Sequence, residues 1–285
     1  MEKIKIAIQK KGRLSEKSLA LLGECGIRFE MGMGSLTVQA SNFPIEILLL
    51  RDDDIPEYVQ SGVADLGIVG QNVVYEKADN IQEIKLLGYG KCRFSLAVGK
   101  KMQYNSVKDL EGKQIATSYP KILSKFLKEN QVEAKIHIIS GSVEIAPSIG
   151  LADAVCDIVS TGSTLLMNGL KEVETILHSQ AVLIGNQSLN VEKQAILKKL
   201  LFRLEAVQKA KNTKYILLNV PNEKIEEISA ILPGMKSPTI MPLQQVGWSS
   251  LHSVIEENDF WEIIEKLQAA GAQGILVMPI EKMII

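Results

Sequence analysis

The chain has 285 residues, a length that suggests two or three domains. Hydrophobic residues make up 46% of it and charged residues 23%, which is the composition of a globular protein and excludes a disordered or fibrous chain. Lys and Arg number 32 against 33 Asp and Glu, so the net charge is -1. No overall basic field would attract nucleic acid, and a polyanionic ligand would have to be held by locally placed cations.

Cysteine and histidine usage excludes two further classes. Cys25, Cys92 and Cys156 share no CxxC spacing, and their odd number argues against a disulfide framework. The histidines are scattered along the chain, which argues against a zinc cluster. The start shows no signal-peptide pattern, and the longest uncharged stretch, residues 237–255, contains prolines and glutamines that a membrane helix would not tolerate. We therefore expect a cytoplasmic protein without a membrane partner.

Short β-branched runs alternate with amphipathic segments in the first part of the chain. We expect strands at residues 4–8, 45–50 and 66–69, and helices at 16–24, 55–60 and 71–76. Ser15 is the expected N-cap of the first helix. Strands that alternate with helices in this way predict βα units and a largely parallel sheet.

The pattern restarts at residue 93. We expect strands at 93–98, 114–117, 135–139, 156–159, 173–177 and 181–184, and helices at 120–129 and 191–211. Chain crossings near residues 93 and 180 would return the last helix to the first lobe. The prediction is two α/β lobes, with lobe I at residues 1–92 plus 181–211 and lobe II at 93–180.

The tail has a different order of elements. Its expected strands are 215–220, 239–243, 249–255 and 275–280, and its expected helices are 223–231 and 260–270. The order β-α-β-β-α-β is that of the ferredoxin-like α+β fold. Residues 212–285 are therefore expected to form a third domain.

A strand at 156–159 leads directly into the turn Ser160–Thr164 (STGST), and residues 165–170 can open a helix. Backbone N–H groups and hydroxyls in such a turn converge on one point, where a phosphate binds well, and Gly162 lets the backbone approach the anion. Asp157, with Glu144 and Asp153 nearby, could hold sugar hydroxyls or magnesium. A turn whose hydroxyls only cap the helix fits the same residues equally well.

Cations follow several predicted strands. Ligands of parallel α/β sheets bind outside the carboxyl ends of the strands, so cations there could neutralise a phosphorylated ligand. These cations are Lys10, Lys11, Arg13, Arg51, Lys91 and Arg93. Two nucleotide-binding motifs are excluded, because Gly32-Met33-Gly34 lacks the third glycine of a dinucleotide fingerprint and no P-loop motif occurs.

The run of residues 144–174 (EIAPSIGLADAVCDIVSTGSTLLMNGLKEVE) closely resembles the signature of the ATP phosphoribosyltransferase family, the first enzyme of histidine biosynthesis. Residues 11–15 (KGRLS), 65–76 (DLGIVGQNVVYE), 92–98 (CRFSLAV) and 237–243 (SPTIMPL) resemble further family motifs in the expected order. The likeness covers essentially all of the chain. The tail is similar to that of the long form of the family, which carries its own regulatory domain.

The resemblance implies a two-lobed catalytic part of type II periplasmic-binding-protein-like fold, followed by a ferredoxin-like (ACT-like) domain. It implies that ATP and 5-phosphoribosyl 1-diphosphate (PRPP) are joined to give N1-(5-phosphoribosyl)-ATP and pyrophosphate. The cofactor would be Mg²⁺, carried mainly by substrate phosphates. Long-form members form hexamers and are inhibited by histidine, so a homo-oligomer, from dimer to hexamer, with L-histidine as effector is expected.

The resemblance also implies roles for individual residues. The 5-phosphate of PRPP would lie on Thr161, Gly162, Ser163 and Thr164, with the ribose hydroxyls on Asp157 and Glu144. Pyrophosphate and the ATP triphosphate would be bound by Lys10, Arg13, Arg51 and Arg93. Histidine would bind at Asn219, Met235, Ser237, Thr239 and Gly274, where Asn219 departs from the carboxylate of some family members. The nucleophile, adenine N1, has a free lone pair, so the scarcity of histidine does not argue against this activity.

Residues 48–54 (LLLRDDD) resemble the element that binds a phosphorylated ribose in other phosphoribosyltransferases. Here the acids precede Ile55-Pro56, so a cap at the helix N-terminus is the expected role.

Two other functions stay open at this point: a non-catalytic two-lobed ligand binder or sensor, and an inactive paralogue that regulates a partner. The sequence shows no export signal or DNA-reading motif, which argues against the first. Retention of Lys10, Arg13, Asp157 and the STGST turn argues against the second.

Overall fold

The computed structural model describes residues 2–30, 35–78, 81–232 and 234–284, so the Gly32-Met33-Gly34 segment lies outside the described residues. The chain forms two compact units. The first unit consists of residues 1–20 and 27–196, and the second unit consists of residues 21–26 and 197–285. The first unit contains two sheets and the second unit one. None of the helices in the described part combines the length and apolar composition that crossing a bilayer takes.

The first sheet has six strands in the order β2-β3-β1-β4-β11-β5. Its central strand β1 pairs in parallel with β3 and β4, while β2, β11 and β5 pair antiparallel to their neighbours. Ile6, Ala7 and Ile8 on β1 point alternately to the two faces of the sheet and are all fully buried, as expected for a strand covered on both faces. The strands are β1 (Ile4–Gln9), β2 (Thr37–Gln39), β3 (Ile45–Leu50), β4 (Leu66–Gly70), β5 (Gln82–Leu86) and β11 (Ala181–Gly185).

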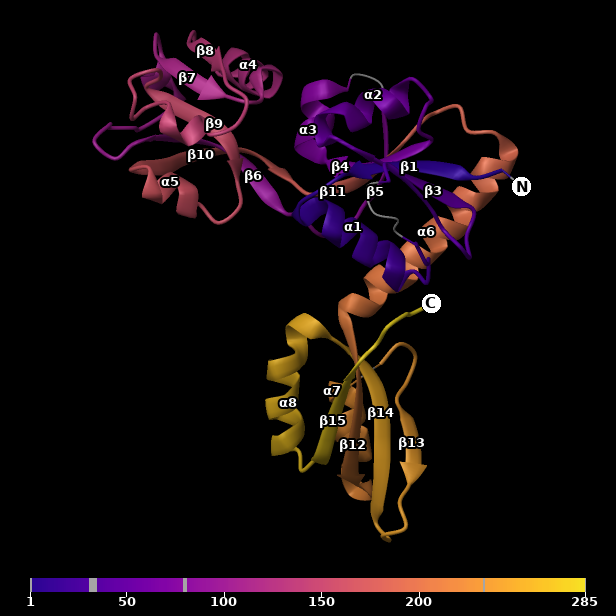
Figure 1. The fold of residues 1–285 in the computed structure, drawn as a ribbon. Helices are drawn as coiled ribbons and strands as arrows, with labels where there is room; N and C mark the ends of the chain where they lie inside the picture. The colour runs from indigo at the N-terminus through magenta and orange to yellow at the C-terminus, as the bar shows by residue number, and fades with distance from the viewer. Residues whose placement is uncertain (1, 31–34, 79–80, 233, 285) are drawn as a thin grey trace. The chain divides into compact units, whose positions relative to one another are not determined.

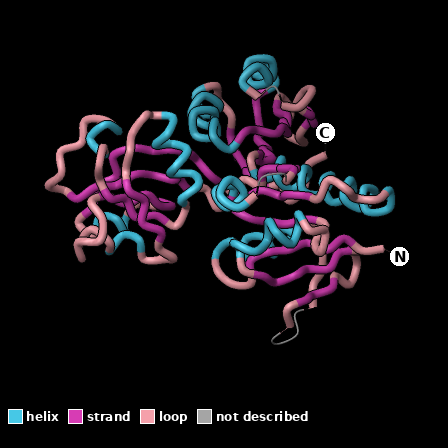
Figure 2. The backbone as a smooth tube through the Cα atoms, turned by 90° about the horizontal axis from the view of Figure 1, so that it is seen from above, coloured by secondary structure: helices cyan, strands magenta, loops and turns pink. Residues whose placement is uncertain are grey.

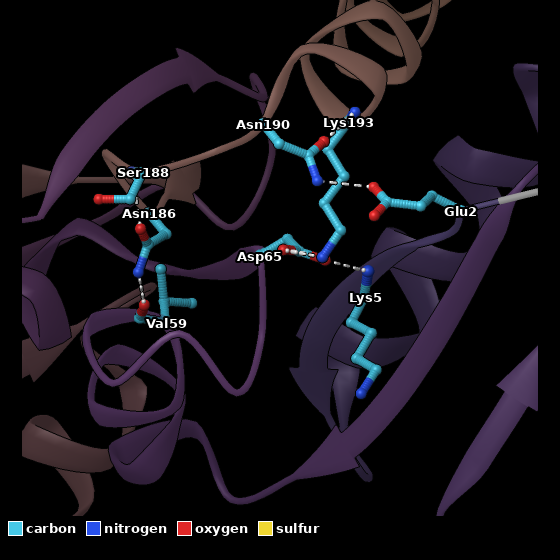
Figure 3. A network of polar contacts seen from close by, with 8 residues as sticks. All are labelled: Glu2, Lys5, Val59, Asp65, Asn186, Ser188, Asn190 and Lys193. Atoms are coloured by element: carbon cyan, nitrogen blue, oxygen red, sulfur yellow. Dashed lines mark hydrogen bonds and ion pairs between the residues drawn. The ribbon is translucent and has the colours of Figure 1, made fainter.

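Helices α1 (Arg13–Glu24), α2 (Ile55–Gln60) and α3 (Gln71–Lys77) lie between strands of the first sheet along the chain, and α6 (Val191–Lys211) follows β11. Polar contacts fix the start of α6 to this sheet (Figure 3). The Asp65 carboxylate accepts hydrogen bonds from the Lys5 backbone N–H (2.9 Å) and from Lys193 Nζ (2.8 Å), and Asn190 Nδ2 donates to Glu2 (2.8 Å). These bonds attach the start of α6 to the first sheet, and the assignment of the whole helix to the first lobe stays a prediction.

The second sheet has five strands in the order β10-β6-β9-β7-β8. β7 is parallel to β8 and β9, whereas β6 and β10 pair antiparallel. Figure 2 shows helices on both faces of these strands, in the left-hand group. The elements are β6 (Cys92–Gly99), β7 (Gln114–Thr117), α4 (Pro120–Glu129), β8 (Lys135–Ile138), β9 (Ala154–Val159), α5 (Ser163–Met167) and β10 (Leu170–Ser179).

The chain passes between these two sheets twice. It leaves the first sheet after β5 to form β6, and it returns from β10 to β11 (Figure 1). Each sheet therefore receives one antiparallel strand, β11 or β6, directly after a crossing. This exchange of strands is the topology of the type II periplasmic-binding-protein fold, so the predicted fold class is confirmed. The exact lobe boundaries stay predictions.

The third sheet has the order β13-β14-β12-β15 with every pair antiparallel, which is the strand order of a ferredoxin-like domain. Ile216, Leu218 and Leu251 lie at its fully buried core. The elements are β12 (Thr213–Pro221), α7 (Ile225–Ile231), β13 (Thr239–Pro242), β14 (Trp248–Glu256), α8 (Phe260–Ala269) and β15 (Gln273–Pro279).

Four expectations need correction. The first helix begins at Arg13, so Ser15 is a buried residue of its first turn and not the N-cap. The sheets are mixed, because the crossing strands run against the parallel ones. The predicted helix at 165–170 is the five-residue α5, and Leu170 already begins β10. The strands β2 and β5 were not predicted, since β2 has three residues and the exposed β5 lacks a buried apolar run.

Candidate active site

Carboxyl ends of parallel strands from both sheets of the first unit meet at two neighbouring cavities. One measures about 300 Å³ and is called here the phosphate cavity; the other measures about 350 Å³ and is called the second cavity. Arg13, Ile158 and Ser160 line both of them, so we describe the two together as the cleft. The position agrees with the rule that α/β sheets bind ligands outside the carboxyl ends of their strands.

The phosphate cavity is built by β9, by the turn after it and by the short helical turn Val143–Ile145. The structure brings together seven residues that the sequence singled out for PRPP and its phosphates. They are Arg13, Glu144, Asp157, Thr161, Gly162, Ser163 and Thr164. Their contacts with substrate stay predictions.

The STGST turn has the geometry of an anion-binding loop. Gly162 adopts a left-handed φ of +82°, which a residue with a Cβ rarely does. The Thr161 and Ser163 hydroxyl oxygens lie 3.0 Å apart, and the exposed Ser163 and Thr164 open α5. Because α5 has only five residues, its dipole contributes little, and local N–H groups and hydroxyls must supply the attraction for a phosphate.

Asp157 is the most perturbed carboxylate of the cleft. Its pKa is raised to about 6, chiefly by burial and in smaller part by the charge of Glu144, while the hydrogen bond from the Ile158 N–H opposes the rise. A ligand that offers hydroxyls or a cation to this carboxylate would stabilise its charged form. The cleft therefore favours such a ligand at neutral pH.

Metal binding by protein side chains alone has little support. Within the residues that the structure describes, no three His, Cys, Asp or Glu side chains gather closely enough to hold an ion. Glu144 and Asp157 do line the phosphate cavity, and two carboxylates suit a magnesium ion that takes its remaining oxygens from phosphates and water.

Asp153, the third predicted acid, does not belong to this group. Its carboxylate accepts a hydrogen bond from the Gln114 N–H (2.8 Å) at the amino end of β9, whereas the turn follows the carboxyl end. The two acids are four residues apart, but the extended strand carries them toward opposite edges of the sheet. Asp153 has a structural role.

The second cavity adds residues that sequence reasoning missed. Asn72 follows β4 and Tyr119 follows β7, and Asn72 Nδ2 donates to the Tyr119 hydroxyl at 2.9 Å. Lys17 lines the cavity one turn after Arg13 on α1. The predicted helix began at residue 16, so the sequence did not show that Arg13 and Lys17 share one helix face. The rule for strand ends, applied to polar residues as well as cations, would have found Asn72 and Tyr119.

Asp52 also lines this cavity, and burial together with the charge of Asp53 raises its pKa. The expected cap at α2 is not observed: within the described structure Asp54, the residue before the helix, makes no side-chain cap hydrogen bond. Asp52 is thus a cleft residue.

The predicted cations separate into three groups. Arg13 lines both cavities, and Lys91 lines the second. Lys10, Lys11 and Arg51 are exposed after strand ends, outside the described linings of these two cavities. Arg93 forms an ion pair with Glu172, which raises the pKa of the guanidinium, and its Nη1 donates to the Ser160 carbonyl oxygen at 3.1 Å. Arg93 thus contacts the turn through the backbone of its first residue, Ser160.

The residues predicted for histidine lie in the ferredoxin-like domain. Asn219 on β12 adjoins Gly274 on β15, since an added Cβ at Gly274 would lie 3.2 Å from Asn219 Nδ2. Met235, Ser237 and Thr239 are exposed on the segment that enters β13. The structure brings the first two together, and the other three stay predictions without a described contact to them.

Comparisons with known proteins agree on one family. A family model described as ATP phosphoribosyltransferase matches residues 51–206, and one described as HisG, C-terminal domain matches residues 210–282. The chain is 58% identical to the ATP phosphoribosyltransferase of Cytophaga hutchinsonii over 281 residues, which are 99% of this chain and 98% of the relative. The identity to that of Bacteroides thetaiotaomicron is also 58%, over 99% of this chain and 100% of the relative.

Among solved structures, the ATP phosphoribosyl transferase (HisG:HisZ) complex from Thermotoga maritima is similar, with a TM-score of 0.62 and 30% identity. The match covers 71% of this chain and 96% of that chain.

Proposed function

Because the chain belongs to the ATP phosphoribosyltransferase family, we propose that it joins ATP to PRPP, forming N1-(5-phosphoribosyl)-ATP and releasing pyrophosphate as the first step of L-histidine biosynthesis. The observation that carries the proposal is the phosphate cavity. It joins the STGST turn, Asp157, Glu144 and Arg13 at the carboxyl end of β9. These groups suit a phosphorylated sugar, because the turn offers donors to the phosphate, the carboxylates accept from the hydroxyls and the cation neutralises charge.

In the proposed reaction the lone pair of adenine N1 forms a bond to C1 of the ribose while the bond from C1 to the pyrophosphate oxygen breaks. The electron pair of the broken bond leaves on pyrophosphate. No base is needed to create the nucleophile, so the chain accelerates the reaction by positioning both substrates and stabilising charge. Asp157 would hold the ribose hydroxyls, and Arg13, which lines both cavities, would face the departing pyrophosphate.

Magnesium would enter with the phosphates of PRPP and neutralise part of their charge, with Glu144 and Asp157 as the carboxylates available to it. Lys10 and Arg51 would bind the outer phosphates of ATP or pyrophosphate from exposed positions on the first sheet. Closure of the cleft would exclude water and limit hydrolysis of PRPP.

The ferredoxin-like domain would make the enzyme responsive to L-histidine through Asn219, Met235, Ser237, Thr239 and Gly274. A homo-oligomer, from dimer to hexamer, is part of this proposal. Assembly in general is supported by the similar Thermotoga maritima structure, which is a complex of HisG with HisZ. We also propose a cytoplasmic location, where both substrates are made.

The test is the absorbance increase that accompanies phosphoribosyl-ATP formation, measured with ATP, PRPP, Mg²⁺ and pyrophosphatase, with and without L-histidine. The expected result is turnover that depends on both substrates and falls when histidine is added. Absence of turnover would refute the transferase proposal, whereas turnover unaffected by histidine would refute only the regulatory part.

A further inference from the structure

A buried carboxylate joins the two sheets of the first unit. Glu76, on α3 beside the first sheet, is 8% exposed. Its two oxygens accept hydrogen bonds from the backbone N–H groups of Lys121 and Ile122, each at 3.0 Å. These donors belong to the first turn of α4, beside the second sheet, where the helix has no carbonyl partner for them.

Helix α4 depends on this carboxylate for its cap. The residue before the helix, Tyr119, makes no side-chain cap hydrogen bond in the described structure, and Pro120 supplies no N–H. A negative charge at the N-terminus of a ten-residue helix is also favoured by the helix dipole. A buried carboxylate without such partners would be costly, so Glu76 and α4 stabilise each other across the two sheets.

Asn72, one turn earlier on α3, makes a second connection to the other sheet. Besides the bond from its Nδ2 to the Tyr119 hydroxyl, its Oδ1 accepts from the Ser179 hydroxyl at 2.8 Å, and its N–H donates to the Ser179 oxygen at 3.1 Å. The close approach requires glycine at position 70, where a Cβ would lie 2.3 Å from Asn72 Oδ1. The side chain of Asn72 is thus held by residues of the second sheet.

The second of these connections lies at the wall of the cleft, and the first joins the same two helices one turn further along α3. Asn72 and Tyr119 line the second cavity together with Asp52 of the first sheet and Ser160 of the second. A change in the distance between α3 and α4 would therefore change the distance between the two walls. Reactions that depend on orientation lose rate steeply when the partners are misplaced by about 1 Å.

We infer that Glu76 and Asn72 are positioning residues, which hold α4 and Tyr119 so that the two walls of the cleft present both substrates to each other. This inference rests on the proposed function. The phosphate cavity, apart from Arg13, is built from second-sheet elements alone, so the PRPP affinity that comes from the 5-phosphate and the ribose should survive when the bonds between α3 and α4 are lost. Turnover needs both walls of the cleft in their correct positions, so kcat should fall.

The experiment compares Glu76→Gln with two controls in full-length protein. The two N–H groups are accepted by different oxygens of Glu76, and in Gln an NH₂ donor replaces one of these oxygens, so Gln in the same position accepts from one N–H group only. The charge control is Glu83→Gln, whose carboxylate accepts from Gln71 on α3 and does not reach the second sheet in any described contact. The stability control is Leu127→Ala, which truncates a buried core residue of α4 that does not bond to Glu76 or Asn72 in any described contact.

For Glu76→Gln we expect kcat to fall about 10- to 100-fold while KM for PRPP stays within about threefold and the melting temperature stays above that of Leu127→Ala. Both controls should keep kcat within about threefold of the wild type. An unchanged kcat in Glu76→Gln, or a kcat loss of the same size in Leu127→Ala, would overturn the inference. Absence of turnover in the wild type would instead refute the proposed function.

If Glu76→Gln does not fold, the inference is tested by measuring kcat in Asn72→Ala, in Tyr119→Phe and in the double variant. Tyr119→Phe removes only the hydroxyl and retains the edge-to-face contact with Phe94 at 5.4 Å between ring centroids. If the two residues act through their hydrogen bond, the double variant should lose no more kcat than the more affected single variant. Losses that multiply in the double variant would show independent roles and overturn the inference.

Discussion

Replacing Asp157 with Asn should stabilise the protein at alkaline pH and abolish its activity. The pKa of this carboxyl is raised to about 6 from an ordinary value of 3.8, chiefly by burial. At 1.36 kcal/mol per pKa unit, ionised Asp157 is about 3 kcal/mol less favourable in the folded chain than in the unfolded chain. Asn has nearly the same size and keeps the Oδ1 acceptor for the Ile158 N–H, 2.8 Å away, but it never ionises.

The gain in stability of Asp157→Asn over the wild type should increase as the pH rises. Below about pH 4 the carboxyl is protonated in both states and ionisation costs nothing. Between about pH 4 and 6 only the unfolded chain ionises, so wild-type stability falls as pH rises; above about pH 6 the cost is complete. We expect Asp157→Asn to exceed the wild type by about 1–3 kcal/mol at pH 8 and by little near pH 4.

The measurement is denaturant unfolding followed by far-ultraviolet circular dichroism at several pH values. Tryptophan fluorescence is unsuitable, because both tryptophans, Trp248 and Trp261, lie in the ferredoxin-like domain. Asp153→Asn is the matched control, since its carboxylate accepts a backbone N–H at the other end of β9, and it should keep turnover. Destabilisation by Asp157→Asn at pH 8, or a gain that does not change with pH, would refute the reasoning.

Three further predictions concern the turn, its support and the ferredoxin-like domain. Thr161→Ala combined with Thr164→Ala should raise KM for PRPP about 10-fold or more without changing the circular dichroism spectrum, because each substitution removes a hydroxyl that donates to the phosphate. An unchanged KM would show that the turn does not bind the phosphate. Glu172→Gln should also raise KM for PRPP, since Arg93 loses the ion pair that holds it against the Ser160 carbonyl, and steady-state kinetics with normal PRPP affinity would contradict this. Leu251→Ala, in the buried core of the tail, should lower the stability of that domain by about 2–5 kcal/mol, read by tryptophan fluorescence, and weaken histidine inhibition more than histidine-free turnover; full inhibition in an unfolded domain would count against its regulatory role.

Local sequence signals predicted the elements well where short-range physics decides. The helices Ile55–Gln60 and Pro120–Glu129 have the predicted bounds, each with proline in the first turn, where a missing N–H is harmless. The start of α1 was misplaced because Ser15 suits both a cap and a first turn, and only its burial separates the two. The mixed pairing of the sheets depends on where the chain crosses, which periodicity does not encode.

In the candidate site, too, the local features were predictable from the sequence and the contacts between distant segments were not. The STGST turn and Asp157 could be found in the sequence because the chemistry of phosphate and sugar binding lies within one strand and the turn after it. Asp153 was misassigned, since nearness along a strand is not nearness in space. Tyr119 and Asn72 are 47 residues apart and were missed, because only the meeting of two sheets makes them neighbours.

The amino-acid sequence by itself determined the family, the order of the elements apart from β2 and β5, and the turn that can bind a phosphate, because each is carried by motifs whose residues are close together in the chain. Tertiary structure alone decided which of the predicted cations line the cleft: Arg13 and Lys91 do, whereas Arg93 is paired with Glu172. It also decided that Glu76 caps a helix of the other sheet. The physical reason is that the partner of a buried charge is chosen by the packing of distant segments, on which local propensity has no influence.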